Sequence, residues 1–382
     1  MLSTEPMCLL SHLRRHGQSV WLDGFERGSI IRGRLPQLVA QHDLQGLLLN
    51  FTGLEQGLDS PHYDQDFRAM ERHPDLDVRA LYEYIVIRDA QMAADLLKVV
   101  HDQTHRYDGY VNLDLSPECM FDAQRTLSEA QRLWQTVGWS NLMLKIPATP
   151  ATLSVLELLV GQGMNVNVTL LFSPQVYEQV AQAYLRGLEL FAMQGGDLSK
   201  VASVVSFSVG RLDESVDTLL RTRLDQASEP QEQELLSSLL GQVATAQAKV
   251  IYQRYQALHQ SARWQNLATL GGQPQRLLWA DIGLDNNQAR RWFYLESLLG
   301  SGTVVTLSAA AIHEGCNGEQ FEAGLNTNLE IAQQTLAQVE QLGLSLEAIA
   351  DQLLLQGIQQ STTAFEQLLR TVEQKRQLRR LQ

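Results

Sequence analysis

The chain has 382 residues, of which 44% are hydrophobic and 19% charged, and its formal net charge is -13 at pH 7. This composition is typical of a globular protein with a large core. The negative charge, without any cluster of Lys and Arg among aromatic residues, argues against a nucleic-acid partner.

The lengths of the apolar runs and the spacing of the cysteines argue against a membrane protein, a secreted protein and a zinc-binding protein. No apolar run approaches the roughly 18 residues that cross a bilayer, and the first residues show no apolar signal segment, so we expect no membrane partner and no secretion. Cys8, Cys119 and Cys316 lie far apart without zinc-type spacing. We therefore expect a cytoplasmic protein without a metal.

Short apolar β-type runs alternate along the chain with longer segments of helical periodicity. The expected strands are 19–23, 45–50, 109–115, 142–147, 165–171, 204–210, 276–282 and 303–308. The expected helices include 79–105, 122–137, 152–162, 174–193, 229–259 and 290–299. Eight strands with helices between them predict the α/β fold class and a (β/α)8 TIM barrel with additional helices. An open doubly wound sheet is the alternative, although no Gly-rich phosphate loop follows an early strand.

Two connections are unusually long. Helical insertions are expected at about 51–108 and 213–275, and a charged helical tail at about 325–382. No repeat, low-complexity tract or Pro/Gly/Ser linker divides the chain, so the sequence predicts one barrel domain over residues 1–382. The sequence leaves the oligomeric state open.

Three successive predicted strands have a polar face. In the run 109–115, Asn112 and Asp114 share a face; in the next strand Lys145 shares one with Met143. In the run 165–171 the polar face is Asn165, Asn167 and Thr169, opposite Val166, Val168 and Leu170. The interior of an ordinary barrel is filled by branched apolar residues, so a polar interior near the carboxyl ends of the strands indicates an active site.

Lys145 is the central residue of this face. A single lysine in a strand usually extends its ammonium group to solvent at the strand end. Here it is surrounded by a carboxylate, amides and a hydroxyl group from neighbouring strands. Burial disfavours the charged form and frees the amine to attack a carbonyl, so Lys145 is a candidate Schiff-base nucleophile.

Several motifs around these positions resemble the transaldolase family, specifically its longer bacterial subfamily among the class I Schiff-base aldolases. They are WLD (21–23), DGYVNLDLSP (108–117), NLMLKIPAT (141–149), GMNVNVTLLFSPQVYEQVAQAYLRGLE (163–189) and SFSVGRLDESVD (206–217). The resemblance covers nearly the whole chain and is most specific between residues 108 and 213.

The resemblance implies a transferase of the pentose phosphate pathway that needs no metal or cofactor. It would move a dihydroxyacetone unit from sedoheptulose 7-phosphate or fructose 6-phosphate to an aldose phosphate. Lys145 would form the imine, and Asp23 would take the proton of the donor's C4 hydroxyl. Asp114 stands where the family usually has glutamate; with Thr169 it would hold the water used in imine formation and hydrolysis.

The resemblance also implies residues that bind the substrate. Asn50 and Asn167 match amides that hold substrate hydroxyls and the enamine. Ser206 and Arg211 match positions that line the pocket, with the arginine directed toward phosphate.

Four segments depart from the family pattern. Leu48 and Phe51 replace the threonine and proline of a Thr-x-Asn-Pro pattern, and Ser208 replaces a commonly aromatic residue. Asp281 stands where the family has a serine that contacts phosphate, and VVTLSAAAI (304–312) replaces an Asn-Thr-Met-Pro pattern. The lysine chemistry is therefore retained, while phosphate recognition is altered. A one- or two-residue shift of the correspondence at the last two strands would also account for the last two differences.

Two other functions stay open. One is a Schiff-base aldolase with an altered sugar substrate. The other is a non-catalytic barrel that acts as an interaction or regulatory protein.

Overall fold

The computed structural model describes residues 9–42, 44–71, 76–282, 288–314 and 322–380, and its centre is a closed barrel of eight parallel strands. The strands follow one another around the barrel in chain order, and the last pairs with the first through Gln18↔Thr303 and the residues after them. Their bounds are β1 Gln18–Asp23, β2 Gly46–Leu48, β3 Tyr110–Asp114, β4 Leu142–Pro147, β5 Val166–Leu171, β6 Ser203–Ser208, β7 Gln275–Ala280 and β8 Thr303–Leu307. The predicted (β/α)8 barrel is confirmed, and the open-sheet alternative is wrong because the first and last strands pair.

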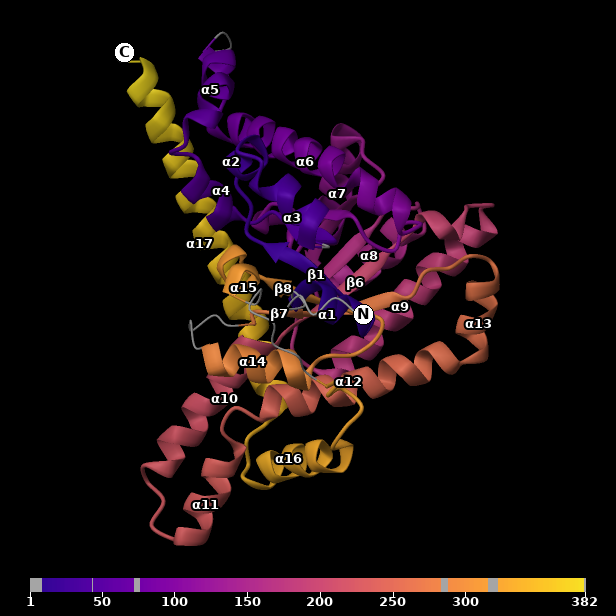
Figure 1. The fold of residues 1–382 in the computed structure, drawn as a ribbon, viewed down its shortest axis with the longest axis vertical. Coiled ribbons are helices and arrows are strands. Elements are labelled where there is room, and N and C mark those ends of the chain that lie inside the picture. Colours follow the sequence, from indigo (N-terminus) through magenta and orange to yellow (C-terminus); the bar gives the residue numbers. More distant parts are fainter. Residues whose placement is uncertain (1–8, 43, 72–75, 283–287, 315–321, 381–382) are drawn as a thin grey trace, which may run out of the picture.

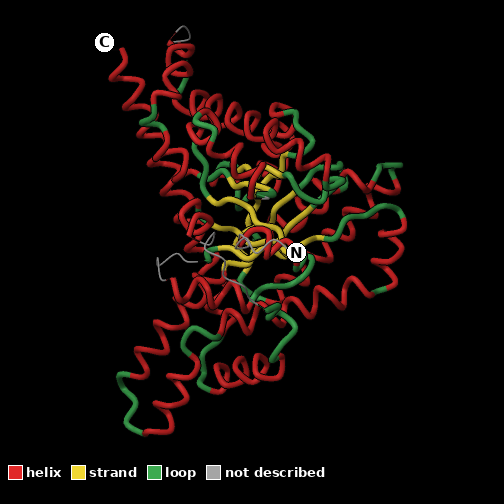
Figure 2. The backbone as a smooth tube through the Cα atoms, viewed as in Figure 1, coloured by secondary structure: helices red, strands yellow, loops and turns green. Residues whose placement is uncertain are grey.

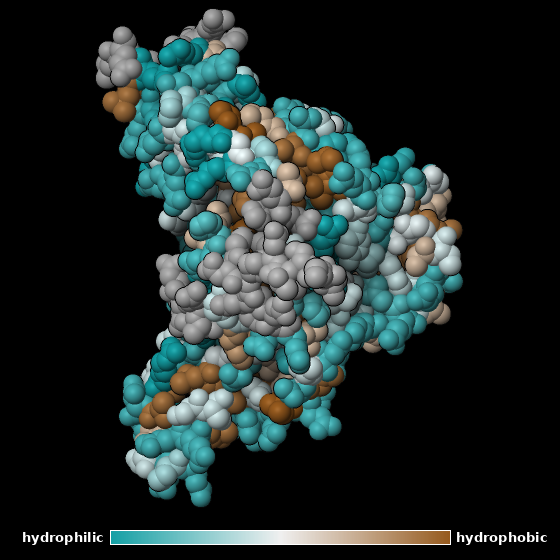
Figure 3. Space-filling view, viewed as in Figure 1, coloured by the Kyte–Doolittle hydropathy of each residue, from teal (hydrophilic) through white to brown (hydrophobic). Residues whose placement is uncertain are grey.

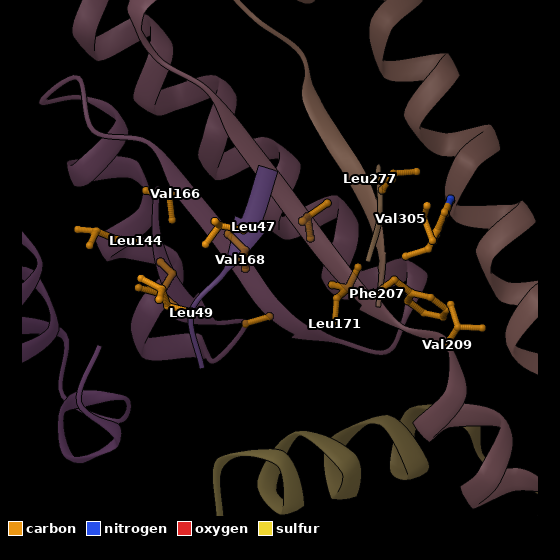
Figure 4. Packing of buried hydrophobic residues seen from close by; sticks show 14 of the residues in the cluster. Leu47, Leu49, Leu144, Val166, Val168, Leu171, Phe207, Val209, Leu277 and Val305 are labelled. Atoms are coloured by element: carbon orange, nitrogen blue, oxygen red, sulfur yellow. The ribbon is translucent and has the colours of Figure 1, made fainter. Parts of the chain in front are cut away.

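Every strand except β5 contributes to two apolar cores, because alternate side chains point to opposite faces. The outward side chains pack against the surrounding helices, and Figure 4 shows members of this outer core, among them Leu144, Val168 and Phe207. A separate apolar cluster fills the middle of the barrel and is formed by Trp21, Leu48, Tyr110, Met143, Ala202, Val204, Leu278 and Val304. Most of the inward residues that follow this cluster toward the carboxyl ends of the strands are polar; Ala280 is an exception.

The amino-terminal end of the barrel is also polar. Buried Arg276 of β7 donates to Asp108 (Nη1 to Oδ1, 2.9 Å) and to the carbonyl oxygens of Tyr107 (3.0 Å) and Thr303 (2.9 Å). Because this ion pair is enclosed and both partners are hydrogen-bonded, it closes the floor of the barrel without adding net charge.

Helices surround the barrel (Figures 1 and 2). The first part of the chain forms α1 Leu9–Arg15, α2 Arg27–Ile31, α3 Arg34–His42, α4 Phe51–Gly57, η1 Pro61–Tyr63, α5 Asp64–Glu71, α6 Val78–Gln103, η2 Pro117–Cys119 and α7 Ala123–Val137. The later part forms α8 Pro150–Val160, α9 Pro174–Met193, η3 Leu198–Lys200, α10 Val209–Leu224, α11 Pro230–Leu239, α12 Val243–Gln260, α13 Ala262–Thr269, α14 Gln288–Ser297, α15 Ala309–Glu314, α16 Leu329–Gln341 and α17 Leu346–Arg380. Within the described residues, no helix has both the length and the apolar composition to cross a membrane.

Local sequence explains where several helices begin. Thr149 and Ser173 cap α8 and α9 with their side chains, and a proline follows each cap at the first helical position. Five of the predicted helices agree with α6, α7, α8, α9 and α14 within about two residues at each end.

The prediction of one helix over 229–259 is wrong. The segment forms α11 and α12 with a break between them, where Gly241 adopts a left-handed conformation with φ 71°. Glycine takes this conformation without steric cost, so the break lets the chain reverse. In Figure 1, α10 and α11 project from the barrel as a pair, and apolar side chains gather on that projection in Figure 3.

The helical tail predicted at about 325–382 forms two helices, α16 and then the 35-residue helix α17. Helix α17 runs along one flank of the barrel toward α4 and α5 (Figure 1). Thr371 donates to Glu55 (3.0 Å), Lys375 pairs with Asp59 (3.1 Å), and Arg376 donates to the carbonyl of Leu76 (2.7 Å). Contacts such as these join the tail to the first insertion. That the barrel, its insertions and this tail form one domain stays a prediction.

Candidate active site

A cavity of about 350 Å³ opens at the carboxyl ends of the strands. The predicted site residues that line it are Asp23, Asn50, Asp114, Lys145, Thr169, Ser206 and Arg211. Residues of α17 complete the wall, namely Gly357, Gln360, Ser361 and Ala364. A larger cavity of about 620 Å³, lined by Arg79, Glu118 and Arg132 among others, includes none of these strand-end residues. The polar strand faces therefore converge on the smaller cavity.

Lys145 and Asp114 form the centre of this cavity. They are register partners on β4 and β3, so their side chains lie next to each other on the inner face of the barrel. The Lys145 Nζ atom lies 2.9 Å from Asp114 Oδ1 and 3.0 Å from Oδ2, and the two side chains are only 12% and 16% exposed. The amine thus has a proton acceptor in direct contact.

Asp23 approaches from the end of β1. Its Oδ1 accepts a hydrogen bond of 3.1 Å from Asn50 Nδ2, and the Oδ1 of Asn50 accepts from the backbone of Gly53 at the start of α4. This cap ends the strand earlier than the predicted 45–50 and holds the amide toward Asp23. Burial raises the pKa of Asp23 above its ordinary value of 3.8; Lys145 opposes the rise, and Asp281 adds to it.

A row of buried hydrogen bonds runs beneath the cavity. Ser206 Oγ donates to Asn167 Oδ1 (2.7 Å), Asn167 Nδ2 donates to Asn112 Oδ1 (2.9 Å), and Asn112 Nδ2 donates to the carbonyl of Leu47 (3.1 Å). Asn167 is fully buried and lies in this row, outside the residues that line the cavity. The sequence did not predict Asn112 as a site residue. Its position on the same strand face as Asp114 could have indicated it.

Thr169 and Leu170 both line the cavity although they are consecutive. The register between β5 and β6 shifts between Val168 and Leu171, and Leu170 has φ 58°, so a local irregularity turns both side chains inward. The prediction that Leu170 lies on the outer face is therefore wrong. Thr169 Oγ1 donates to the carbonyl of Ile146 (3.3 Å).

Arg211 lies in the first turn of α10, because β6 ends at Ser208 rather than at the predicted residue 210. Its Nε lies 3.2 Å from Asp281 Oδ2, and its Nη1 donates to Gln360 Oε1 (2.7 Å). Gln360 belongs to α17 and is separated from Arg211 by 149 positions, so no local pattern could have indicated it.

The departures from the family pattern also lie at the cavity. Leu48, Ser208, Asp281 and Thr306 line it. Asp281 directly follows β7, which pairs with β6 without interruption from Ser203↔Gln275 to Ser208↔Ala280. Its carboxylate therefore does lie in the pocket.

The described residues contain no group of three His, Cys, Asp or Glu side chains placed to hold a metal ion. Cys119 is buried and has a free thiol, whereas Cys8 and Cys316 lie outside the described residues. Burial raises the pKa of the Cys119 thiol to about 12. At neutral pH this thiol is protonated and is a poor metal ligand or nucleophile.

Comparison with known proteins identifies the family. The model of the family described as transaldolase/fructose-6-phosphate aldolase matches residues 20–372. The chain belongs to this family. The resemblance inferred from the KIPAT and NVNVTLL motifs is therefore confirmed.

Relatives in the family are similar along almost their whole length. The chain is 32% identical to a transaldolase of Trichodesmium erythraeum (strain IMS101) over 369 residues, 96% of this chain and 97% of the relative. It is 34% identical to transaldolase 2 of Nostoc punctiforme over 370 residues (96% and 97%), and 35% identical to a transaldolase of Thiobacillus denitrificans over 364 residues (95% and 99%).

Proposed function

We propose that this protein is a transaldolase that carries a dihydroxyacetone unit from a ketose to an aldose on Lys145. The observation that carries the proposal is the Lys145 amine, held inside a closed barrel within 2.9 Å of Asp114 and in a cavity shared with Asp23. Family membership supports the same reaction.

Imine formation is the first step. The Lys145 ammonium transfers a proton to Asp114, and the free amine attacks the C2 carbonyl of the ketose. The carbinolamine that forms loses water, which leaves an iminium ion on Lys145. Thr169, two residues beyond Asn167, the register partner of Lys145 on β5, holds that water together with Asp114.

Carbon–carbon cleavage is the second step. Asp23 accepts the proton of the C4 hydroxyl, the C3–C4 bond breaks, and its electron pair moves into the iminium ion to give an enamine. An aldehyde leaves, and the three-carbon unit stays on Lys145. Asn50 keeps the Asp23 carboxylate oriented through its 3.1 Å hydrogen bond.

Transfer reverses these steps with a second aldehyde as acceptor. The enamine has to be protected from water until that aldehyde arrives, and the wall formed by α17 limits access to the cavity. The family pattern assigns Asn167 to substrate hydroxyls. Because Asn167 lies beneath the cavity wall, in this proposal its bonds to Ser206 and Asn112 fix the floor of the cavity, and its second N–H is the donor left for a substrate group.

The family pattern supports sedoheptulose 7-phosphate or fructose 6-phosphate as donor and an aldose phosphate as acceptor, in the pentose phosphate pathway. In that assignment, Ser206 contacts the bound sugar and Arg211 faces its phosphate. The cytoplasmic location expected from the cysteines stays a prediction.

Borohydride trapping tests the proposal. Purified protein is incubated with fructose 6-phosphate or fructose, reduced, and analysed by peptide mass spectrometry, and we expect a reduced three- or six-carbon adduct on Lys145. With fructose 6-phosphate and erythrose 4-phosphate together, we expect glyceraldehyde 3-phosphate as a product.

A matched pair of variants locates the reaction. Lys145→Met removes the amine and keeps the aliphatic stem, so both the adduct and the transfer activity should disappear. Lys249→Met is the control, because Lys249 is also mostly buried but donates to the carbonyl of Thr327 (2.9 Å) away from the cavity. Absence of any adduct with both ketoses, or an unchanged activity in Lys145→Met, would contradict the proposal and favour a non-catalytic barrel.

A further inference from the structure

The charges that line the cavity are already compensated. Lys145 is paired with Asp114 through both carboxylate oxygens, and Arg211 is paired with Asp281 at 3.2 Å. Asp23 is a third carboxyl group in the same wall. The described wall therefore offers no cation without a carboxylate partner to an incoming anion.

Arg211 is engaged on two of its three guanidinium nitrogens. Nε faces Asp281 and Nη1 donates to Gln360. A phosphate group binds an arginine best through two parallel N–H bonds. Here one edge of the guanidinium already faces a carboxylate, so a phosphate has to displace Asp281 or bind beside it.

The backbone holds Asp281 at this place. Its φ is 60°, and its carbonyl oxygen packs so closely on Gly210 that a Cβ there would lie 2.3 Å away. The residues that follow it in the sequence, GLDNN at 283–287, include no lysine or arginine. The carboxylate side chain, only 14% exposed, thus stays beside the Arg211 guanidinium.

We propose that Asp281 sets the substrate class of this transaldolase site, which favours ketoses that end in an uncharged hydroxyl group over ketoses that end in phosphate. A phosphate that reaches Arg211 also lies next to the Asp281 carboxylate, and like charges repel strongly in a partly buried pocket. A hydroxyl group instead donates to Asp281 and accepts from Arg211 without disturbing their pairing. This inference rests on the proposed transfer reaction on Lys145 and departs from the phosphorylated donors of the family pattern.

The test compares kcat/KM for fructose and fructose 6-phosphate in the wild type and in Asp281→Asn. The two ketoses share the carbons that react, and each rate is corrected for the open-chain fraction of its sugar. We expect the wild type to use fructose at least as well as fructose 6-phosphate. In Asp281→Asn the ratio of kcat/KM for the phosphate ester to that for fructose should rise at least about tenfold, which corresponds to about 1.4 kcal/mol.

Two further variants test whether the change comes from the Asp281 carboxylate beside Arg211 or from the loss of any negative charge. Asp225→Asn removes an equal charge from an exposed position at the end of α10, and its ratio should stay at the wild-type value. Adding Arg211→Gln to Asp281→Asn should remove the gain, because the phosphate then has no guanidinium to bind.

Each remaining outcome bears on a different claim. A wild type that prefers fructose 6-phosphate tenfold, or a ratio that does not change in Asp281→Asn, overturns the inference while adducts on Lys145 leave the transaldolase assignment standing. If neither ketose leaves an adduct on Lys145, the proposed function and this inference both fail. The wild-type comparison needs no variant, so it decides the matter even where Asp281→Asn does not fold.

Discussion

Replacing Asn112 by leucine tests whether the buried row beneath the cavity positions Asn167 for catalysis. Asn112 is fully buried, accepts from Asn167 Nδ2 (2.9 Å) and donates to the carbonyl of Leu47 (3.1 Å). Leucine has a similar shape but neither polar group. The variant loses two hydrogen bonds and leaves two buried groups without these partners, so the free energy of unfolding should fall by about 2 to 4 kcal/mol.

Activity should fall as well. Asn167 keeps its bond from Ser206 but loses the contact that fixes the other end of its amide. Because small displacements of positioning groups in an active site are costly, we expect kcat to drop about 10- to 100-fold in the folded enzyme. Urea unfolding followed by tryptophan fluorescence gives the stability, and a coupled aldehyde assay at low temperature gives kcat.

Asn141→Leu is the matched control. Asn141 is equally buried and makes two side-chain bonds, to the carbonyl oxygens of Ala94 and Gly109 (both 2.9 Å), but it precedes β4 at the opposite end of the barrel. Its loss should lower stability by a similar amount and leave kcat of the folded enzyme near the wild-type value. An equal loss of kcat in both variants, or none in Asn112→Leu, would refute the positioning role.

Three other predictions follow from the same contacts. Asn50→Ala removes a hydrogen bond that lowers the pKa of Asp23, so that pKa rises. The proposed mechanism requires an ionised Asp23 to accept the C4 proton, so the acid limb of the kcat/KM profile should move to higher pH, and a shift to lower pH would contradict that role. Burial raises the pKa of Asp213 to about 6 from an ordinary 3.8, so the folded chain binds this proton more tightly than the unfolded chain. Its contribution to the free energy of unfolding should therefore fall as the pH rises from about 4 to about 6, and urea titrations at pH 5 and 7 should show a smaller decrease in Asp213→Asn than in the wild type; equal decreases would argue against it. Gly210→Ala places a Cβ 2.3 Å from the carbonyl oxygen of Asp281, so we expect a loss of about 1 to 3 kcal/mol in urea unfolding and a lower kcat/KM, whereas wild-type values would show that the contact relaxes without cost.

The barrel and the centre of its site could be read from local patterns. Alternating side chains on three neighbouring strands place Asp114, Lys145 and Thr169 on one face, and strands that follow one another in a barrel bring such faces together. The helices with clear caps or periodicity were likewise located within a few residues. These features depend on residues that are close in sequence or on adjacent strands, so their pattern can be recognised in the amino-acid sequence.

Other features depended on contacts between distant segments. The Arg211–Gln360 bond joins residues 149 positions apart, and the inward turn of Leu170 follows from an irregular register between β5 and β6. The break between α11 and α12 is instead local: Leu240 leaves the helical conformation with ψ 126°, and Gly241 after it is left-handed, within an otherwise helical pattern. The hydrophobic periodicity of the sequence predicts neither the bond, nor the inward turn of Leu170, nor the break between the helices.

The sequence by itself determined the chemistry proposed for this protein, because Lys145 and Asp114 lie on neighbouring strands and the alternation of side chains along each strand fixes the direction in which they point. Only the tertiary structure decided how the charge of Arg211 is paired at the cavity. There Arg211 of α10 meets Asp281, which follows β7, and Gln360 of α17. The physical reason is that a strand direction is set by neighbouring residues, whereas the pairing of a charge depends on which distant segments the packed barrel and its C-terminal helix bring within a few ångströms.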